Sequence, residues 1–327
     1  MDRRTFLKGA GLTLVGLSTF NYNSVLAAVK SPEASVAGDL QVPFSAGRKR
    51  PTIKVTANAC DCHHHIYDPI RFPYVPQDMR NQPPATVDAY RLLQKRLGLT
   101  RNVIVNPSAY GTDNRCTLDA LKQLGSNARA VVVVDPQITN NDLEKMHRLG
   151  VRGIRLNIAR GGIKDSNTIL ALSSRVNELG WHIQFWMNAD DTVNMEELLM
   201  KLSSPLVFDH RGHLPQPAGI NHPAFKVICK LIDKGNTWVK LSGLYQDSKI
   251  GDPTYADAVE VGRAYVQYAP QRMVWGTDWP HPNVFSERWP WPDDANMLDL
   301  LAVQAPNEVV RNRILVENPA TLYGFPQ

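Results

Sequence analysis

Two histidines one residue apart, His63 and His65, end a short apolar run in the sequence ACDCHHHI. Side chains alternate along a strand, so we expect His63 and His65 to share one face and His64 to point away in a structural role. Two imidazoles that aim at one point can bind a metal ion or polarise a carbonyl oxygen. His63 and His65 are therefore candidate catalytic residues.

Two further polar residues stand where apolar runs end. His210 follows LVFD, and Asp278 follows MVWGT. A carboxylate in such a place can take a proton from water and return it to a leaving group. A helix-capping role for Asp278 is disfavoured, because the WPHP that follows is a poor helix start. Together with His63 and His65, these residues form the predicted catalytic set.

Eight short apolar, β-branched runs alternate with stretches of helical period from Ala59 onward. The helical period is clear at 87–97, 141–149 and 223–233. Eight such units predict a buried parallel sheet closed into a single-domain (β/α)8 TIM barrel over residues 56–327. The catalytic groups of a TIM barrel come from the carboxyl ends of its strands, where the candidate residues stand. The predicted strands are 59–62, 102–105, 130–134, 150–156, 182–185, 206–209, 237–241 and 273–276.

The chain begins with a segment that is typical of an export signal. MDRRTFLKGAGLTLVGLSTF joins a charged start to an apolar stretch that is too short to span a bilayer of roughly 30 Å. RRTFLK resembles the twin-arginine pattern, and VLA at 25–27 predicts a cleavage site. We therefore expect a signal peptide at 1–27, an irregular leader at 28–55, and a folded periplasmic protein without stable membrane association after signal removal.

The charge balance excludes one class of partner. The formal net charge is +5, and without residues 1–27 the chain holds 33 basic and 30 acidic residues. This small excess, without a dense Lys/Arg run, predicts no binding to nucleic acid. Nothing in the sequence sets an oligomeric state.

Longer motifs resemble the amidohydrolase superfamily, and within it the branch of 2-pyrone-4,6-dicarboxylate lactonase, sugar lactonases and D-galactarolactone isomerase. The similarity runs from about Ala59 to Tyr323 and includes DCHHHIYDP, PSAYGTDN, ARAVVVVDP, RGIRLN, FDHRGH and WGTDWPHPN. The resemblance implies that His63, His65 and His210 polarise a lactone carbonyl and that Asp278 activates water.

The same resemblance implies a set of substrate-binding residues. Arg155, in RGIRLN, matches an arginine that binds a substrate carboxylate, and no carboxylate stands near it in the sequence. A guanidinium fork is chemically suited to that task. Ser108 matches a substrate-contacting serine. The other predicted substrate-binding residues are Tyr110, which lies close to Ser108, and Arg80, Trp186 and Asn188, of which Trp186 stands near an expected tyrosine.

Some positions depart from the branch. Gln246 stands near the place of a further arginine, and Arg160 is offset by one residue from another. These changes weaken the case for a planar dicarboxylated pyrone and leave room for a carboxylated, hydroxyl-bearing sugar lactone. The segment QFWMN lacks the Lys, His or Glu that bridges two metals in the wider superfamily, so we expect no binuclear site. The resemblance to the metal-independent pyrone lactonase branch implies that no cofactor is needed. The alternative is one zinc on His63, His65 and Asp278.

The predicted function is hydrolysis of a carboxylated lactone, with a small carboxylated lactone as the only expected partner. Three alternatives remain open at this point. They are a lactone isomerase on a sugar diacid lactone, a zinc-dependent decarboxylase, and a non-catalytic periplasmic sugar-acid binding protein.

Overall fold

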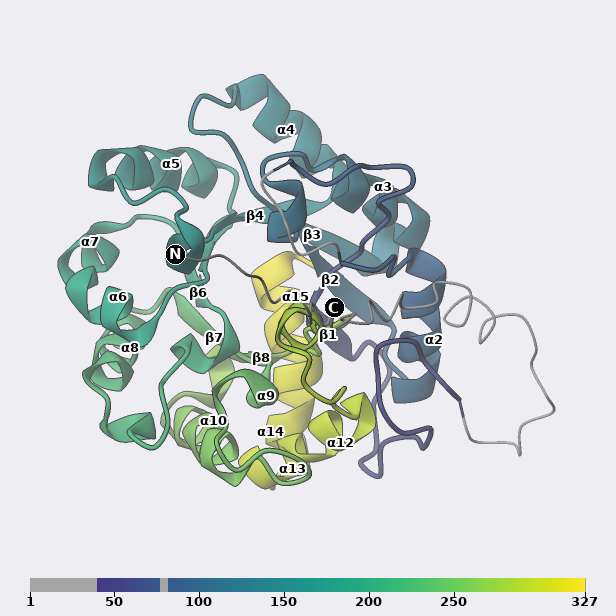
Figure 1. Ribbon diagram of the computed structural model, residues 1–327. Coiled ribbons are helices and arrows are strands. Elements are labelled where there is room, and N and C mark those ends of the chain that lie inside the picture. Colours follow the sequence, from purple (N-terminus) through teal and green to yellow (C-terminus); the bar gives the residue numbers. More distant parts are fainter. Residues whose placement is uncertain (1–39, 77–81, 327) are drawn as a thin grey trace, which may run out of the picture. The chain divides into compact units, whose positions relative to one another are not determined.

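The near-continuous apolar runs form eight parallel strands, as their buried character requires. The computed structural model describes residues 40–76 and 82–326. Each strand pairs with the next in chain order, from β1 to β8 (Figure 1). The strands are β1 Cys60–His64, β2 Arg101–Val105, β3 Ala128–Val132, β4 Val151–Leu156, β5 His182–Phe185, β6 Leu206–Phe208, β7 Thr237–Leu241 and β8 Met273–Trp275.

Helices follow the strands and surround the sheet in Figure 1, with their apolar sides packed on it. Among the described residues, no helix has both the length and the apolar character needed to cross a bilayer. The helices are α2 Val87–Leu97, α3 Arg115–Leu124, α4 Asn140–Leu149, α5 Ser166–Glu178, α6 Ala189–Asn194, α7 Glu196–Lys201, α8 Pro223–Asp233, α9 Leu244–Asp247, α10 Ala256–Tyr268, α11 Pro282–Glu287, α12 Asp294–Asp299, α13 Leu301–Gln304, α14 Glu308–Asn312 and α15 Asn318–Tyr323.

The first and last strands approach each other and nearly close the sheet into a TIM barrel. The link lies just beyond β8, where the backbone N–H of Asp278 donates to the carbonyl of His63 at 2.7 Å. The N–H of His65 donates in turn to the carbonyl of Trp279 at 2.8 Å. The predicted (β/α)8 architecture is confirmed, and its closure brings Asp278 beside the two histidines of β1.

A break in register near the end of β1 sets which side chains enter the barrel. The pairing of β1 with β2 shifts between Asp61 and His64. Asp61 accepts a hydrogen bond from the hydroxyl of Tyr90 on α2, and the ring of His64 stacks on Tyr90 with centroids 3.6 Å apart. Both residues therefore face α2, whereas His63 and His65 face the barrel, as predicted.

One predicted strand ends earlier than its sequence suggests. The apolar run extends to Val134, but β3 stops at Val132. The backbone N–H of Val133 donates to the side-chain oxygen of Asn114 at 3.0 Å, and the Val133 carbonyl accepts from the same amide at 2.8 Å. A side chain thus takes over the hydrogen bonds that the next strand would otherwise make.

The described part of the predicted leader, from residue 40 onward, packs against the barrel. The indole N–H of Trp279 donates to the carbonyl of Pro43 at 2.8 Å, and the buried guanidinium of Arg96 donates to the carbonyls of Ala46, Gly47 and Lys49. The predicted signal peptide at 1–27 lies outside the described residues.

Candidate active site

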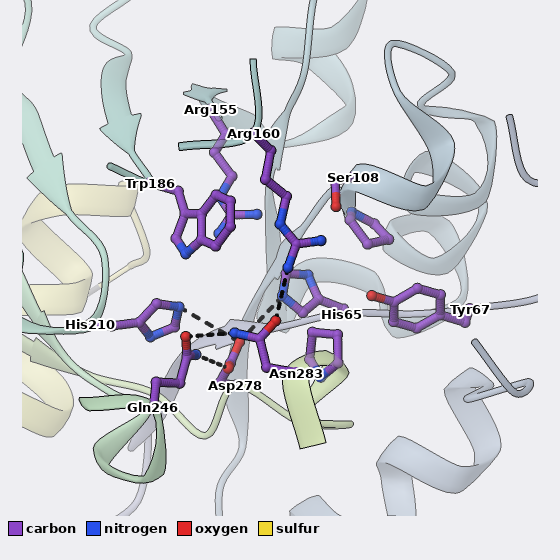
Figure 2. A pocket seen from close by; sticks show the side chains of 12 residues that line it. His65, Tyr67, Ser108, Arg155, Arg160, Trp186, His210, Gln246, Asp278 and Asn283 are labelled. Atoms are coloured by element: carbon purple, nitrogen blue, oxygen red, sulfur yellow. Dashed lines mark hydrogen bonds and ion pairs between the residues drawn. The ribbon is translucent and has the colours of Figure 1, made fainter. Parts of the chain in front are cut away.

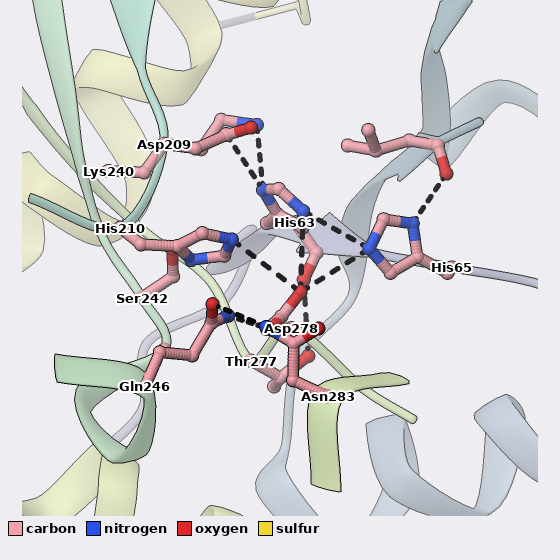
Figure 3. Close-up of polar contacts among 12 residues, drawn as sticks. His63, His65, Asp209, His210, Lys240, Ser242, Gln246, Thr277, Asp278 and Asn283 are labelled. Atoms are coloured by element: carbon pink, nitrogen blue, oxygen red, sulfur yellow. Dashed lines mark hydrogen bonds and ion pairs between the residues drawn. The ribbon is translucent and has the colours of Figure 1, made fainter. Parts of the chain in front are cut away.

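The strand ends bring His63, His65, His210 and Asp278 together at one end of the barrel (Figure 3). Oδ1 of Asp278 lies 3.4 Å from Nε2 of His63, 3.3 Å from Nε2 of His65 and 3.8 Å from Nε2 of His210. All four residues are buried. The four predicted catalytic residues therefore share one focus, formed by three imidazole nitrogens and one carboxylate oxygen.

His63 and His65 differ in the partners of their Nδ1 atoms. Nδ1 of His63 lies 3.3 Å from the buried ammonium of Lys240, which can only donate, and 3.1 Å from Oδ1 of Asp209, which can only accept, so either tautomer of His63 has a partner at Nδ1. Nδ1 of His65 lies 2.7 Å from the carbonyl of Val105, which can only accept. His65 therefore carries its proton on Nδ1, and its Nε2 can accept from Nε2 of His63 at 3.3 Å. Burial, together with the charge of Lys240, lowers the pKa of His63 to about 3, so this ring is neutral at working pH.

His210 is held differently, by a group that can donate or accept. Its Nδ1 lies 2.9 Å from the hydroxyl of Ser242, and burial lowers its pKa well below the usual value. Because the serine hydroxyl can donate to Nδ1, neutral His210 can carry its proton on Nε2. His210 is thus the ring best placed to donate a hydrogen bond to a substrate oxygen.

Asp278 is fixed on its second oxygen and through its backbone. Oδ2 accepts from the hydroxyl of Tyr245 and from Nε2 of Gln246, each at 2.6 Å. Burial alone would raise the pKa of Asp278, but the surrounding imidazoles outweigh it and hold this pKa below its usual range. Asp278 is therefore a carboxylate, as a general base must be, with Oδ1 directed at the histidines.

A pocket opens directly above this focus (Figure 2). The guanidiniums of Arg155 and Arg160 lie 5.7 and 4.7 Å from the ring centre of Trp186. Two cations and one aromatic surface thus face the carboxylate and imidazoles across the pocket, an arrangement suited to an anionic substrate. The lining residues are His65, Tyr67, Pro107, Ser108, Arg155, Arg160, Trp186, His210, Gln246, Asp278, Pro282 and Asn283.

Arg155 has a carboxylate partner that is distant in the sequence. Its Nε donates to Oδ2 of Asp209 at 3.0 Å, and both side chains are buried. Asp209 lies 54 residues further along the chain, at the end of β6, so proximity in sequence gave no sign of the pair. Arg155 nevertheless also lines the pocket, so it has both a structural partner and a face toward the substrate.

A layer of buried polar side chains beneath the histidines was not predicted. Lys240 of β7 donates to Oε1 of Gln184 at 2.6 Å, and Nε2 of Gln184 donates to Asp209 at 3.0 Å. Oδ1 of Asp209 lies 3.1 Å from Nδ1 of His63. The available signal was a polar residue inside an otherwise apolar strand, as in HIQF and TWVKL, because such residues are buried only when paired.

The other predicted substrate residues fall in different places. Ser108 and Trp186 line the pocket. Tyr110 does not line it, and its buried hydroxyl accepts from the backbone N–H of Asp68 at 2.8 Å. Asn188 is exposed at the start of α6 and is not a lining residue either. Arg80 lies outside the described residues.

The focus also offers ligands for one metal ion. One ligand atom from each of His63, His210 and Asp278 lies within 4.8 Å of the others. The zinc alternative named His65 in place of His210, and His65 is equally close to Asp278. Imidazole nitrogens and a carboxylate oxygen are suitable zinc ligands, so the donor set fits a single zinc ion.

A family model described as amidohydrolase matches residues 60–325 of this chain. The chain belongs to the amidohydrolase family. This amidohydrolase is 31% identical over 289 residues to a 2-pyrone-4,6-dicarboxylate hydrolase of Comamonas testosteroni, covering 85% of this chain and 94% of the relative. It is 34% identical over 267 residues to a D-galactarolactone isomerase of Agrobacterium fabrum, covering 81% and 90%. A crystal structure from Agrobacterium tumefaciens, 32% identical, superposes with a TM-score of 0.77 over 84% of this chain and 99% of that one. The predicted family is confirmed.

Proposed function

We propose that this amidohydrolase hydrolyses the ring ester of a carboxylated lactone. The observation that carries the proposal is the single focus of Asp278, His63, His65 and His210 beneath a pocket that holds two arginines. The relatives named above act, by their names, on a pyrone dicarboxylate and on galactarolactone. Each of these is a lactone with at least one carboxylate.

The residues support direct hydrolysis of the ring ester in three steps. Asp278 takes a proton from water while the water oxygen forms a bond to the lactone carbonyl carbon. Nε2–H of His210 donates to the carbonyl oxygen, where negative charge develops. The ring C–O bond then breaks, and Asp278 returns its proton to the leaving oxygen. The product is the open-chain hydroxy acid, or its keto form where the leaving oxygen is that of an enol.

We propose that this reaction proceeds without a metal. The ammonium of Lys240, 3.3 Å from Nδ1 of His63, lowers the affinity of that ring for a second cation. A zinc ion held by His63, His210 and Asp278 would supply Lewis-acid polarisation of the carbonyl. In the reaction described above, Nε2–H of His210 takes that part.

Isomerisation is the second candidate, because one relative is named as a lactone isomerase. The same site serves both reactions if a hydroxyl of the substrate replaces water as the nucleophile. Product analysis separates them, since hydrolysis releases an acid and isomerisation does not.

The test is a lactone panel with matched carboxylated and uncharged members, assayed by acid release after treatment with a chelator. We expect hydrolysis of the carboxylated members and retained turnover in metal-depleted protein. Arg155→Met should lower kcat/KM on the carboxylated lactone by at least about tenfold, because a charge-assisted pair of this kind contributes roughly 1.5–3 kcal/mol. The loss should be much smaller on the uncharged lactone.

Arg155→Lys is the matched control, since it keeps a cation beside Asp209. An equal loss on both lactones in Arg155→Met would show that Arg155 acts only through Asp209. Absence of turnover on every lactone would contradict the proposed function, and turnover that disappears with the chelator and returns with zinc would contradict the metal-free sequence.

We also propose that the protein is exported by the twin-arginine route and is active in the periplasm. The support is the RRTFLK start followed by a short apolar stretch. Changing Arg3 and Arg4 to lysine should leave the precursor in the cytoplasm, as measured by cell fractionation. Normal amounts of mature periplasmic protein from this variant would contradict the proposal.

A further inference from the structure

Three hydrogen bonds in series connect a pocket arginine to the general base (Figure 2). Arg160 donates from Nη2 to Oδ1 of Asn283 at 3.0 Å, and Nδ2 of Asn283 donates to Oε1 of Gln246 at 2.9 Å. Nε2 of Gln246 donates to Oδ2 of Asp278 at 2.6 Å. Arg160 follows β4, Asn283 lies on α11 after β8, and Gln246 lies on α9 after β7, so the series crosses the mouth of the pocket.

The two charged ends determine the direction of the whole series. The guanidinium of Arg160 can only donate, so Asn283 must present its oxygen to it and its NH2 group to Gln246. The carboxylate of Asp278 can only accept, so Gln246 must present its NH2 group to it. Rotation of either amide would place two donors or two acceptors face to face. Aligned bonds between a cation and an anion also strengthen one another.

Arg160 differs from Arg155 in its charge balance. Arg155 is buried and paired with Asp209, whereas Arg160 is exposed and its guanidinium rests over Trp186. Within residues 40–76 and 82–326, no carboxylate pairs with Arg160. No described carboxylate therefore compensates the charge of Arg160, and it is available to an anionic group of the substrate.

We propose that Arg160 binds an anionic group of the substrate and that Asn283 and Gln246 transmit this contact to Asp278. An anionic group that immobilises Arg160 also immobilises Asn283 and Gln246 through their hydrogen bonds. These two residues then hold Asp278 with Oδ1 directed at the reacting carbonyl. The anionic group consequently raises turnover as well as affinity. Asn283 and Gln246 are positioning residues, and the inference rests on the proposed lactone hydrolysis.

The first test separates kcat from KM on a matched pair of lactones, one carboxylated and one uncharged. In the wild type, the carboxylated member should show both the lower KM and the higher kcat. Asn283→Ala breaks the series but leaves Arg160 in place, so the carboxylated lactone should keep its lower KM relative to the uncharged one. The ratio of kcat on the carboxylated lactone to kcat on the uncharged lactone should fall by at least about threefold, a modest coupling between linked residues. An unchanged kcat advantage overturns the proposal.

The second test is a double-mutant cycle in kcat between Arg160→Met and Gln246→Leu. These residues are connected through Asn283, and we expect their effects on the carboxylated lactone to be non-additive by about threefold or more. In the Asn283→Ala background the two effects should become additive. Arg91→Met removes an exposed arginine that pairs with Asp88 on α2, and it should leave both kinetic constants unchanged.

Thermal unfolding of each variant confirms that it is folded before kinetics are compared. Additive effects in the wild-type background overturn the series while leaving lactone hydrolysis intact. A wild type that opens no lactone overturns the proposed function, and the inference falls with it.

Discussion

Replacing Asp278 with asparagine should lower turnover by about a hundredfold or more, because the amide cannot take a proton from water. The change keeps the shape of the side chain. The amide oxygen can still accept from Tyr245 and Gln246, and the NH2 group can then face Nε2 of His65. We therefore expect a folded protein with nearly native substrate affinity and a greatly reduced kcat.

The measurement is kcat on the best lactone of the panel, with thermal unfolding of the same preparation. Ser286→Ala on α11 is a suitable control, since its exposed hydroxyl bonds only to backbone carbonyls of its own helix. Near-native turnover by Asp278→Asn would remove Asp278 from the role of general base.

The largest expected effect on stability belongs to Asp209. Its buried carboxylate lies 3.0 Å from Nε of Arg155 and 3.7 Å from Nζ of Lys240. Asp209→Asn leaves both cations buried without their counter-charge, and breaking a buried ion pair in this way costs about 3–5 kcal/mol. Denaturant unfolding of the two proteins should show this difference. Asp113→Asn, which breaks the exposed pair with Arg115, should cost at most about 1 kcal/mol.

The pH dependence of that difference follows from the charge state of Asp209. Burial raises its pKa, but the contact with His63 and the charges of Arg155 and Lys240 outweigh burial and hold it well below the usual range. A depressed folded-state pKa stabilises the protein above the unfolded-state pKa of roughly 3.9. The gap between wild type and Asp209→Asn should therefore persist at neutral pH and shrink only in acid. A gap that shrinks between pH 8 and 6 would contradict this assignment.

The barrel could be predicted because its signals are local. An apolar strand and a helix of regular period are each visible in a short stretch of sequence, and the eight strands lie within two residues of their expected positions at either end. The end of β3 was misplaced because Asn114, nineteen residues upstream, takes the hydrogen bonds of Val133. Such a contact depends on how two elements pack, and no local pattern contains it.

In the candidate site, too, the residues with a local signal could be predicted and the long-range contacts could not. His63, His65, His210 and Asp278 could be found because catalytic groups of a barrel stand at strand ends. The pairing of Arg155 with Asp209 could not, because their strands are not adjacent in the sheet. The contact of Lys240 with His63 joins residues 177 positions apart. The closure of a barrel determines which distant side chains come into contact inside it, and no short sequence motif contains this information.

The seam between β1 and the end of β8 has a consequence for how activity arises during folding. The backbone bonds from Asp278 to His63 and from His65 to Trp279 join segments more than 200 residues apart. Contacts of such separation form late, since a long loop must be ordered before they are gained. A fragment that ends before β8 lacks the general base and leaves the edge of β1 unpaired. The rate at which activity recovers after refolding should accordingly measure the pairing of β1 with the segment that follows β8.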